Sequence, residues 1–455
     1  MTLLTEDTIV ALSTPLGKSG IGVVRLSGRD ALALTLSISS NPTKSIRDRA
    51  PVLTRLVEPS SGETLDHAMV TYFQAPRSYT CEDVVEISCH GSPIVLKEIL
   101  RLLMNSGARL ATPGEFTMRA LLRGRIDLLQ AEAIHDLIEA QTLFQAKLAQ
   151  QQALGSLSRR IAPVKEQLVR LISLMEAGID FAEDDVLPIA STDVQQQLEL
   201  ILSELKDVHD SFALGRIVCS GLTIAIVGKP NVGKSSLFNS LLREDRALVT
   251  EVPGTTRDTI SEVTQISGIP IRLLDTAGIR KAHDTVEQLG IKRSLQALAD
   301  ADRVLFVLDS SQPLTEQDRD IVTELGEIPF ILVLNKIDLA ERATLDWDIG
   351  GHRVCRVSAT QGSGLDALRD AILDTYSKDI SEFSEGIITN VRQNQAVTES
   401  ISALNKSLNS LTSAMPQEVV LLDLYGALRS LGSLTGETTV EDILGHIFST
   451  FCIGK

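Results

Sequence analysis

The sequence lacks the features of secreted, membrane-spanning or disulfide-stabilised proteins. No apolar run reaches 18 residues, so we expect no membrane span. The five cysteines are odd in number and scattered, which argues against a disulfide framework and favours a reducing compartment. The first ten residues carry two acidic side chains and no basic one, unlike a signal peptide. We therefore expect a cytoplasmic protein.

The chain is also short of positive charge and of metal-ligand clusters. It has 43 Lys and Arg against 59 Asp and Glu, a net charge of −16. This balance argues against broad binding to a nucleic-acid backbone, although it allows one local basic patch. The seven histidines and five cysteines share no ligand spacing. Cys89 and His90 form the only close pair in the sequence; we interpret them as a strand end, with metal binding as the weaker alternative.

Residues 228–236, GKPNVGKSS, carry the clearest chemistry. They follow an apolar run at residues 222–227, which is typical of a buried strand, and they precede the start of a helical pattern. A G-x-x-x-x-G-K-S string in this setting is typical of a phosphate-binding loop whose backbone N–H groups face the ligand. Lys234 would supply positive charge to the β- and γ-phosphates, and Ser235 would offer a hydroxyl to Mg²⁺. We therefore predict a nucleoside triphosphate site.

Two later motifs indicate that the base is guanine. NKID, residues 335–338, follows an apolar strand, and SAT, residues 358–360, follows a further strand expected at residues 353–357. The Asp338 carboxylate can accept hydrogen bonds from the N1–H and the amino group of guanine, a pair that adenine does not offer. Lys336 can lay its alkyl stem along the base, and the Ala359 N–H can reach the guanine O6. These motifs predict a guanine-nucleotide domain.

The hydrolysis machinery shows one informative absence. DTAG, residues 275–278, ends another apolar strand; its Asp275 would hold Mg²⁺ through water and its Gly278 N–H would meet the γ-phosphate. Many small GTPases follow this motif with a Gln that orients the attacking water, whereas this chain has Ile279. Another group must take that role, or hydrolysis is slow. The candidates downstream are His283, Asp284 and Glu287, and Arg257 and Arg280 are both possible arginine fingers.

A threonine-rich segment, TEVPGTTRD at residues 250–258, lies between the phosphate loop and DTAG. A Thr hydroxyl here could meet Mg²⁺ and the γ-phosphate, which would make a switch that orders with GTP. Thr256 is the candidate, with Thr255 beside it, and an ordinary Ser/Thr turn is the alternative.

The pattern of periodicity predicts a multidomain chain. Residues 1–117 have the pattern of an α+β domain, with strands expected at 8–12, 22–26, 52–57, 68–73 and 84–89 and a helix at 92–105. Residues 118–216 and 379–455 have helical apolar stripes, and they flank the α/β nucleotide domain at residues 217–378. We expect the two helical parts to form one all-α domain into which the nucleotide domain is inserted.

These motifs, together with VPGTTRD, DTVEQLGI and the terminal CIGK, resemble the MnmE or TrmE family of tRNA-modification GTPases. The phrases GIGVVRLSG, YTCEDVVEISCHG, TPGEFTMRA and DLLQAEAI are similar to that family too, so the resemblance spans essentially the whole chain. It implies a folate-binding N-terminal domain that forms a homodimer, a helical domain and an inserted Ras-like P-loop G domain. It also implies a GTP hydrolase that modifies C5 of the wobble uridine of certain tRNAs. An FAD-binding MnmG-type subunit would be its partner in a heterotetramer or larger complex, and 5-formyl- or methylene-tetrahydrofolate would supply the one-carbon unit.

The resemblance also implies roles for residues of the G domain. K⁺ would replace an arginine finger, held by Asn231, Thr250, Val252 and Thr255, while Ser235 and Thr256 would hold Mg²⁺. Glu287 would orient the attacking water through a second water and would act in catalysis with Lys234. The GTP contacts implied by motif match are Asn231, Val232, Gly233, Lys234, Ser235, Ser236, Thr250, Glu251, Val252, Pro253, Gly254, Thr255, Thr256, Asp275, Thr276, Ala277, Gly278, Asn335, Lys336, Asp338, Ser358, Ala359 and Thr360.

The folate contacts implied by the resemblance are Arg25, Glu86, Arg125 and Lys455. Arg125 stands where the family often has Lys, and the two side chains are not equivalent donors. From the residues alone, a surface ion pair is the favoured interpretation of Arg25. Cys452 is a catalytic candidate, as a nucleophile or redox thiol; alternatively it packs while Lys455 makes the contact.

One local basic cluster and two other functions remain open from the sequence. Arg119, Arg123 and Arg125 could contact tRNA, or they could be ordinary helix-surface charge. The nucleotide motifs also fit a regulatory switch, for instance in ribosome assembly. A third hypothesis is a one-carbon enzyme with a regulatory GTPase.

Overall fold

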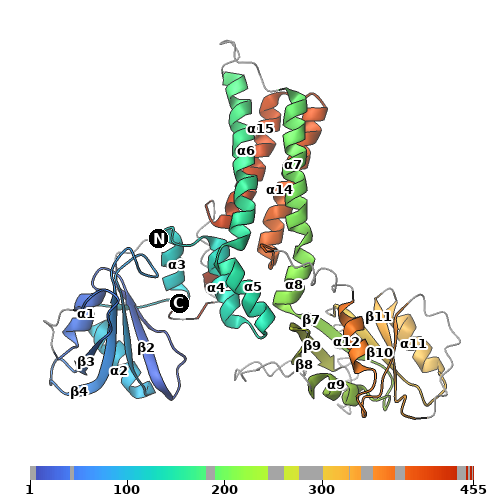
Figure 1. The fold of residues 1–455 in the computed structure, drawn as a ribbon, viewed down its shortest axis with the longest axis horizontal. Coiled ribbons are helices and arrows are strands. Elements are labelled where there is room, and N and C mark those ends of the chain that lie inside the picture. The colour runs from blue at the N-terminus through green and yellow to red at the C-terminus, as the bar shows by residue number, and fades with distance from the viewer. Residues whose placement is uncertain are drawn as a thin grey trace, which may run out of the picture. The chain divides into compact units, whose positions relative to one another are not determined.

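The computed structural model in Figure 1 describes residues 7–40, 46–180, 190–243, 261–275, 301–326, 328–339, 352–374, 385–437, 447–448, 451–452 and 454. The chain forms two compact units. Unit 1 contains Met1–His135, Ala153–Ser158 and Leu428–Lys455, and unit 2 contains Asp136–Gln152 and Arg159–Ala427. None of the described helices is both long enough and apolar enough to cross a membrane.

Unit 1 is built on a six-stranded sheet in the order β3-β4-β5-β2-β1-β6. Its strands are β1 (Ile9–Leu12), β2 (Ser19–Ser27), β3 (Val52–Val57), β4 (Thr64–Phe73), β5 (Val84–Gly91) and β6 (Arg109–Leu110). The pairs are antiparallel except for β1 with β6. The α+β class and the five expected strands are confirmed. The two-residue β6 was not predicted because both of its side chains are exposed and leave no alternating pattern.

Helices α1 (Ala31–Ser37) and α2 (Pro93–Asn105) pack on this sheet. The buried residues of α2 recur three or four apart at Leu96, Ile99 and Leu103, so one stripe of the helix faces the core. Pro93 occupies the first turn, where its missing N–H removes no helical hydrogen bond. Cys89 and His90 lie in β5 as expected. Among the described residues no cluster of His, Cys, Asp and Glu could hold a metal ion.

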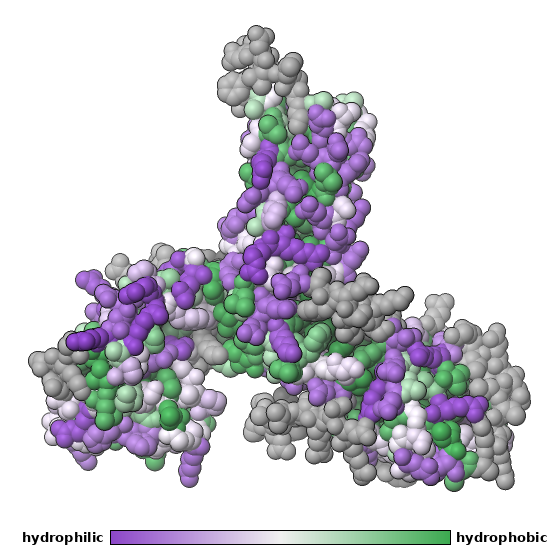
Figure 2. Space-filling view, in the orientation of Figure 1, coloured by the Kyte–Doolittle hydropathy of each residue, from purple (hydrophilic) through white to green (hydrophobic). Residues whose placement is uncertain are grey.

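Helices occupy much of the described chain outside the two sheets. They are α3 (Glu115–Leu122), α4 (Leu128–Glu139), α5 (Leu143–Ala153), α6 (Ser156–Asp180), α7 (Ser191–Asp210), α8 (Phe212–Ser220), α14 (Val391–Thr412) and α15 (Gln417–Thr435). In unit 2, α7 packs against α14. A helix that precedes the G domain in the sequence therefore contacts one that follows it. The face of α6 and α7 that Figure 2 shows is mainly hydrophilic, as expected when apolar stripes face inward.

The G domain in unit 2 has a second six-stranded sheet, in the order β12-β11-β10-β7-β9-β8. Its strands are β7 (Leu222–Val227), β8 (Ser261–Ile266), β9 (Ile269–Asp275), β10 (Arg303–Asp309), β11 (Phe330–Asn335) and β12 (Val354–Arg356). All pairs are parallel except β8 with β9. The carboxyl ends of the parallel strands therefore meet at one edge, where ligands of open α/β sheets bind.

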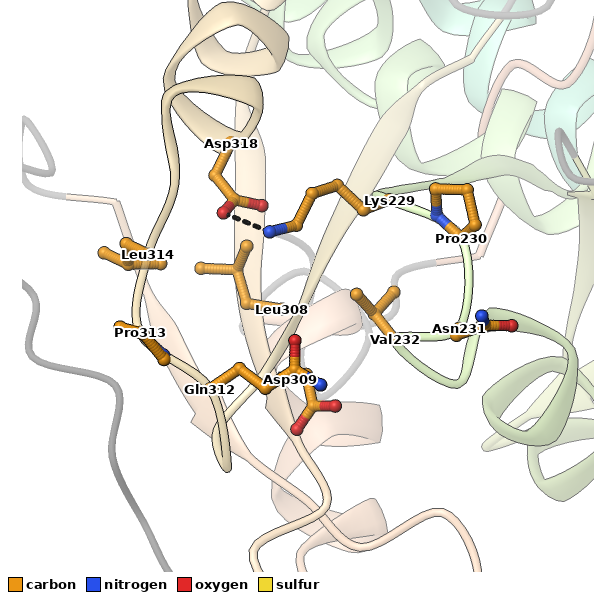
Figure 3. Close-up of a pocket in the computed structure, with 10 residues that line it drawn as sticks. All are labelled: Lys229, Pro230, Asn231, Val232, Leu308, Asp309, Gln312, Pro313, Leu314 and Asp318. Carbon is orange, nitrogen blue, oxygen red and sulfur yellow. Dashed lines mark ion pairs between the residues drawn. The ribbon is translucent and has the colours of Figure 1, made fainter.

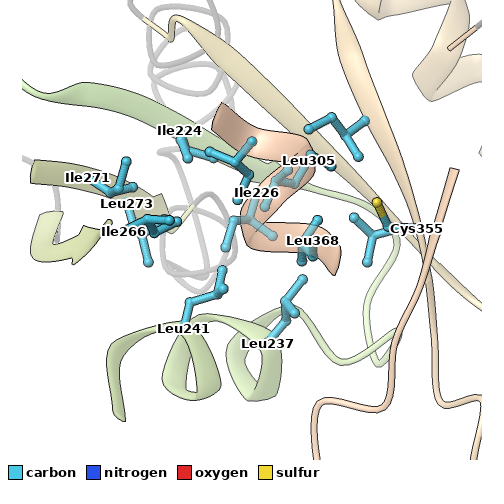
Figure 4. Close-up of a cluster of buried hydrophobic side chains, with 14 of the residues drawn as sticks. Ile224, Ile226, Leu237, Leu241, Ile266, Ile271, Leu273, Leu305, Cys355 and Leu368 are labelled. Atoms are coloured by element: carbon cyan, nitrogen blue, oxygen red, sulfur yellow. The ribbon is translucent and has the colours of Figure 1, made fainter. Parts of the chain in front are cut away.

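Helices on both faces explain why the central strands are almost wholly apolar. Helices α9 (Lys234–Arg243) and α12 (Leu365–Leu373) bury a core that includes Ile224, Ile226 and Leu305, part of which is drawn in Figure 4. Helix α11 (Glu316–Leu325) packs with the alternate strand residues, such as Phe306 and Leu332. The predicted α/β class of this domain is confirmed.

Candidate functional site

The phosphate loop leaves the carboxyl end of β7, and two of its glycines are fixed by close contacts. Gly228 has a φ of +150°, and a Cβ there would lie 2.4 Å from the carbonyl oxygen of Val307. Gly233 has a φ of +96°, and a Cβ there would lie 2.3 Å from the amide nitrogen of Asn335. Any side chain at either position would disrupt the loop. The loop then opens directly into the N-terminus of α9, where backbone N–H groups favour an anion.

Lys234, the first residue of α9, is buried and lies within this loop. Its ammonium donates to the carbonyl oxygens of Gly228 at 2.8 Å and Lys229 at 2.6 Å. Ser235 and Ser236 follow it and are exposed. The cradle of two constrained glycines, one buried cation and a helix N-terminus therefore suits a polyphosphate, and the Ser235 hydroxyl suits Mg²⁺ that keeps most of its ligands from phosphate and water.

Asn335, at the end of β11, joins the three loops of the site. Its amide donates to the carbonyl oxygen of Val232 at 3.0 Å, and its side-chain oxygen accepts from the N–H of Ala359 at 3.0 Å. The side chain is buried. Sequence reasoning placed Asn335 among the GTP contacts; the structure gives it the further role of tying the phosphate loop to the turn at residues 358–360.

Lys336 contacts the phosphate loop, and Asp338 contacts the turn at residues 358–360. The Lys336 ammonium crosses the phosphate loop, donating to the carbonyl oxygen of Asn231 at 2.7 Å and to the Asp309 carboxylate at 2.7 Å. Ser358 donates to one oxygen of Asp338 at 2.5 Å and so orients that carboxylate. Ser240 of α9 holds the same turn by donating to the Ala359 carbonyl oxygen at 2.6 Å. The phosphate loop and the motif at residues 335–338 therefore lie together, although Val232 and Asn335 are 103 residues apart in the sequence.

The flank of the phosphate loop contains an ion pair that the motif search missed. Lys229 contacts the buried carboxylate of Asp318 at 2.7 Å, and Asp318 also accepts from the backbone and hydroxyl of Thr315 at the start of α11. A cavity of about 160 Å³ beside this pair is lined by both residues and by Asn231 and Asp309 (Figure 3). Burial opposes ionisation of Asp309, but hydrogen bonds from Lys336 and Ser311 lower its pKa. Lys229 occupies a variable position of the G-x-x-x-x-G-K-S motif, so the motif does not predict this ion pair.

Several expected site residues lie outside the described part of the chain. Asp275 is the last residue of β9. The predicted contacts that the structure does not describe are Thr250, Glu251, Val252, Pro253, Gly254, Thr255, Thr256, Thr276, Ala277, Gly278, Glu287 and Lys455.

Unit 1 brings Arg25 and Glu86 together. They are paired residues on the adjacent strands β2 and β5, and the Arg25 guanidinium donates to Glu86 from Nε at 3.0 Å and from a terminal nitrogen at 2.8 Å. The same guanidinium lies 5.9 Å from the ring centre of Tyr79 and 5.8 Å from that of Phe116. Burial raises the pKa of Tyr79, while the charges of Arg25 and Arg125 act in the opposite direction. Cys452 is exposed.

The interpretation of Arg119 as part of a basic surface patch is wrong. Arg119 is buried, and its guanidinium contacts Glu82 at 3.2 Å, Glu115 at 2.9 Å and Asp7 at 2.7 Å. Arg123 also pairs with Glu82. The charge of Arg119 is therefore neutralised inside unit 1. Arg123 and Arg125 are both exposed, and Arg125 has no ion pair among those found in the described residues.

Two family models match most of this chain. The chain matches the family models described as "GTP-binding protein TrmE N-terminus" over residues 8–125 and "MnmE helical domain" over residues 128–452. The G domain of the T. maritima FeoB iron transporter aligns at 29% identity with 34% of this chain and 97% of that chain, with a TM-score of 0.26, too low to support a conclusion about the fold.

Two full-length relatives illustrate the similarity, and both are described as "tRNA modification GTPase MnmE". The protein of Koribacter versatilis is 49% identical over 99% of both chains. That of Aquifex aeolicus is 44% identical over 99% of this chain and 100% of its own length. With two family models matched and relatives this similar from end to end, the chain belongs to the MnmE family of tRNA modification GTPases.

Proposed function

We propose that this chain is a K⁺-activated GTPase that modifies C5 of the wobble uridine of certain tRNAs together with an FAD-binding, MnmG-type subunit. Its one-carbon source would be a tetrahydrofolate derivative. The observation that carries the proposal is the guanine site in which Asn335 joins the phosphate loop to the turn at residues 358–360. It lies in a chain whose full-length relatives are named for tRNA modification.

The residues of the G domain divide the work of hydrolysis. Lys234 and the N–H groups of the phosphate loop bind the triphosphate, and Asp338 selects guanine. Mg²⁺ would be held by Ser235 and Thr256, and K⁺ by Asn231, Thr250, Val252 and Thr255. These cations supply positive charge that neutralises the charge developing on the phosphates. Glu287 would orient the attacking water, a role that Ile279 cannot perform.

The N-terminal domain would supply the folate site and a homodimer interface. Arg25 and Glu86 already form a charged pair beside two aromatic rings, a setting that suits the carboxylates and the flat ring of a folate. Arg125 and Lys455 would complete it, and the exposed Cys452 is the candidate reactive thiol. We propose three domains: the N-terminal domain at residues 1–117, the helical domain at residues 118–216 and 379–455, and the G domain at residues 217–378.

The proposed activation by K⁺ predicts a large difference between the GTP turnover in KCl and that in NaCl. GTP turnover by the full chain in KCl is expected to exceed turnover in NaCl at equal ionic strength by roughly a hundredfold, because a charge placed at the reacting phosphates acts mainly in the transition state. Phosphate release at saturating GTP measures it. Glu287→Ala should bind GTP normally and lose the KCl-stimulated turnover. Equal rates in the two salts would contradict the proposal for K⁺.

A further inference from the structure

The last residues of the chain are seated on unit 1. We use the term terminal arm for the described residues 447–448, 451–452 and 454. Phe448 and Phe451 are buried in an apolar cluster with Leu128 and Ala131 of α4. The N–H of Gly114 donates to the carbonyl oxygen of Cys452 at 3.4 Å. Two aromatic anchors therefore hold the arm, whereas the Cys452 side chain between them and the chain end is exposed.

Gly454 makes the closest approach of the arm to the sheet. It is buried, with a φ of +102°, and a Cβ there would lie 2.3 Å from the carbonyl oxygen of Leu12 and 3.1 Å from the Cα of Ser13. Because the obstruction is backbone, it cannot move aside cheaply. Both the conformation and the space therefore require glycine.

The carbonyl oxygen of Gly454 accepts from two side chains. Arg25 donates to it at 3.3 Å and Ser13 donates to it at 3.2 Å. Arg25 uses a nitrogen here that it does not use for Glu86. One guanidinium thus contacts both Glu86 of β5 and Gly454 of the arm. A ligand that alters the hydrogen bonds of Arg25 must therefore also alter the stability of the docked arm.

We propose that Gly454 is a positioning residue for the folate-dependent step. Its carbonyl seats the arm against Arg25 and so restricts the position of the exposed Cys452, two residues earlier. Seating of the arm and occupancy of the proposed folate site then stabilise each other, because both use Arg25. This inference rests on the proposed folate-dependent function.

The test compares three single substitutions in the full chain. Gly454→Ala introduces the clash. Ser13→Ala removes one hydrogen bond without a clash. Gly62→Ala is the matched control, since Gly62 also has a positive φ, +72°, but an added Cβ meets nothing within 4 Å. Two quantities are measured: the affinity for 5-formyl-tetrahydrofolate by calorimetry, and hydrogen exchange of peptides covering the arm, with and without that compound.

Gly454→Ala is expected to weaken binding at least about tenfold and to speed exchange in the arm, with the ligand no longer slowing it. Ser13→Ala should weaken binding about threefold, as for one net hydrogen bond. Gly62→Ala should leave both quantities unchanged. Unchanged exchange in β2 and β5 peptides of Gly454→Ala would show that unit 1 still folds.

Normal affinity and normal arm exchange in Gly454→Ala would overturn this inference alone. Absence of binding by the unsubstituted chain, with its arm still protected, would instead overturn the folate part of the proposed function and the positioning role with it.

Discussion

Asp338→Asn is expected to lower the affinity for GTP about a thousandfold or more. A carboxylate accepts from both donors on the guanine edge, whereas an amide presents one acceptor and one donor, so one guanine donor is left facing another donor. Sites built around such hydrogen bonds reject a mismatched partner by large factors. The fold should survive, because Ser358 donates to Asp338 at 2.5 Å and the Asn oxygen can accept the same bond.

Xanthine nucleotides provide the matching control for this substitution. Xanthine carries an oxygen where guanine carries its amino group, so the amide of Asn could donate to it. Fluorescent GDP and XDP analogues, titrated against both proteins, should show affinity for XDP rising in Asp338→Asn while that for GDP falls. Retention of full GDP affinity would mean that Asp338 does not read the base.

Arg119→Met is expected to lower the stability of unit 1 by about 3 kcal/mol. The substitution leaves Glu82 and Glu115 buried with one fewer cation, and breaking a buried pair from one side costs about 3–5 kcal/mol. The lower value is expected because Arg109 also contacts Glu115 and Arg123 also contacts Glu82. Hydrogen exchange of β2 and β5 amides in the full chain measures this local free energy.

Acid should reveal the same network. Burial opposes ionisation of Glu115, but hydrogen bonds from Arg109, Thr112 and Arg119 lower its pKa below the ordinary 4.5. A lowered pKa in the folded state means that Glu115 stabilises unit 1 above about pH 4.5 and that this contribution is lost as the pH falls through the folded-state value. Arg119→Met should reduce that loss.

Arg123→Met is the control for Arg119→Met. Because Arg123 is more exposed, its substitution should lower the stability of unit 1 by only about 1 kcal/mol. Equal losses of stability for the two substitutions would contradict the buried role of Arg119.

The fold was predictable where a segment's own residues decide its structure. The stripe of α2 has a period that only a helix satisfies, and the short apolar run that became β7 is typical of a buried strand. The phosphate loop was equally predictable. Gly228 and Gly233 both have a positive φ, which favours glycine, and the glycines of the motif are visible in the sequence. In contrast, β6 pairs over only two residues and depends on its neighbour β1.

The failures concern side chains whose partners are distant in the sequence. Arg119 looked like surface charge because Glu82, 37 residues away, could not be placed beside it. The pairing of Lys229 with Asp318 and the docking of Gly454 on Leu12 depend on tertiary contacts in the same way. Charge and glycine are visible in a sequence, whereas the group that neutralises or obstructs them is not.

The most direct test of the central claim is mass spectrometry of wobble uridines in tRNA from cells that lack this chain. The account predicts loss of the C5 modification, restored by the unsubstituted chain and not by Glu287→Ala, since modification would require GTP hydrolysis. An unchanged nucleoside profile, in cells without a second copy of the gene, would contradict the account.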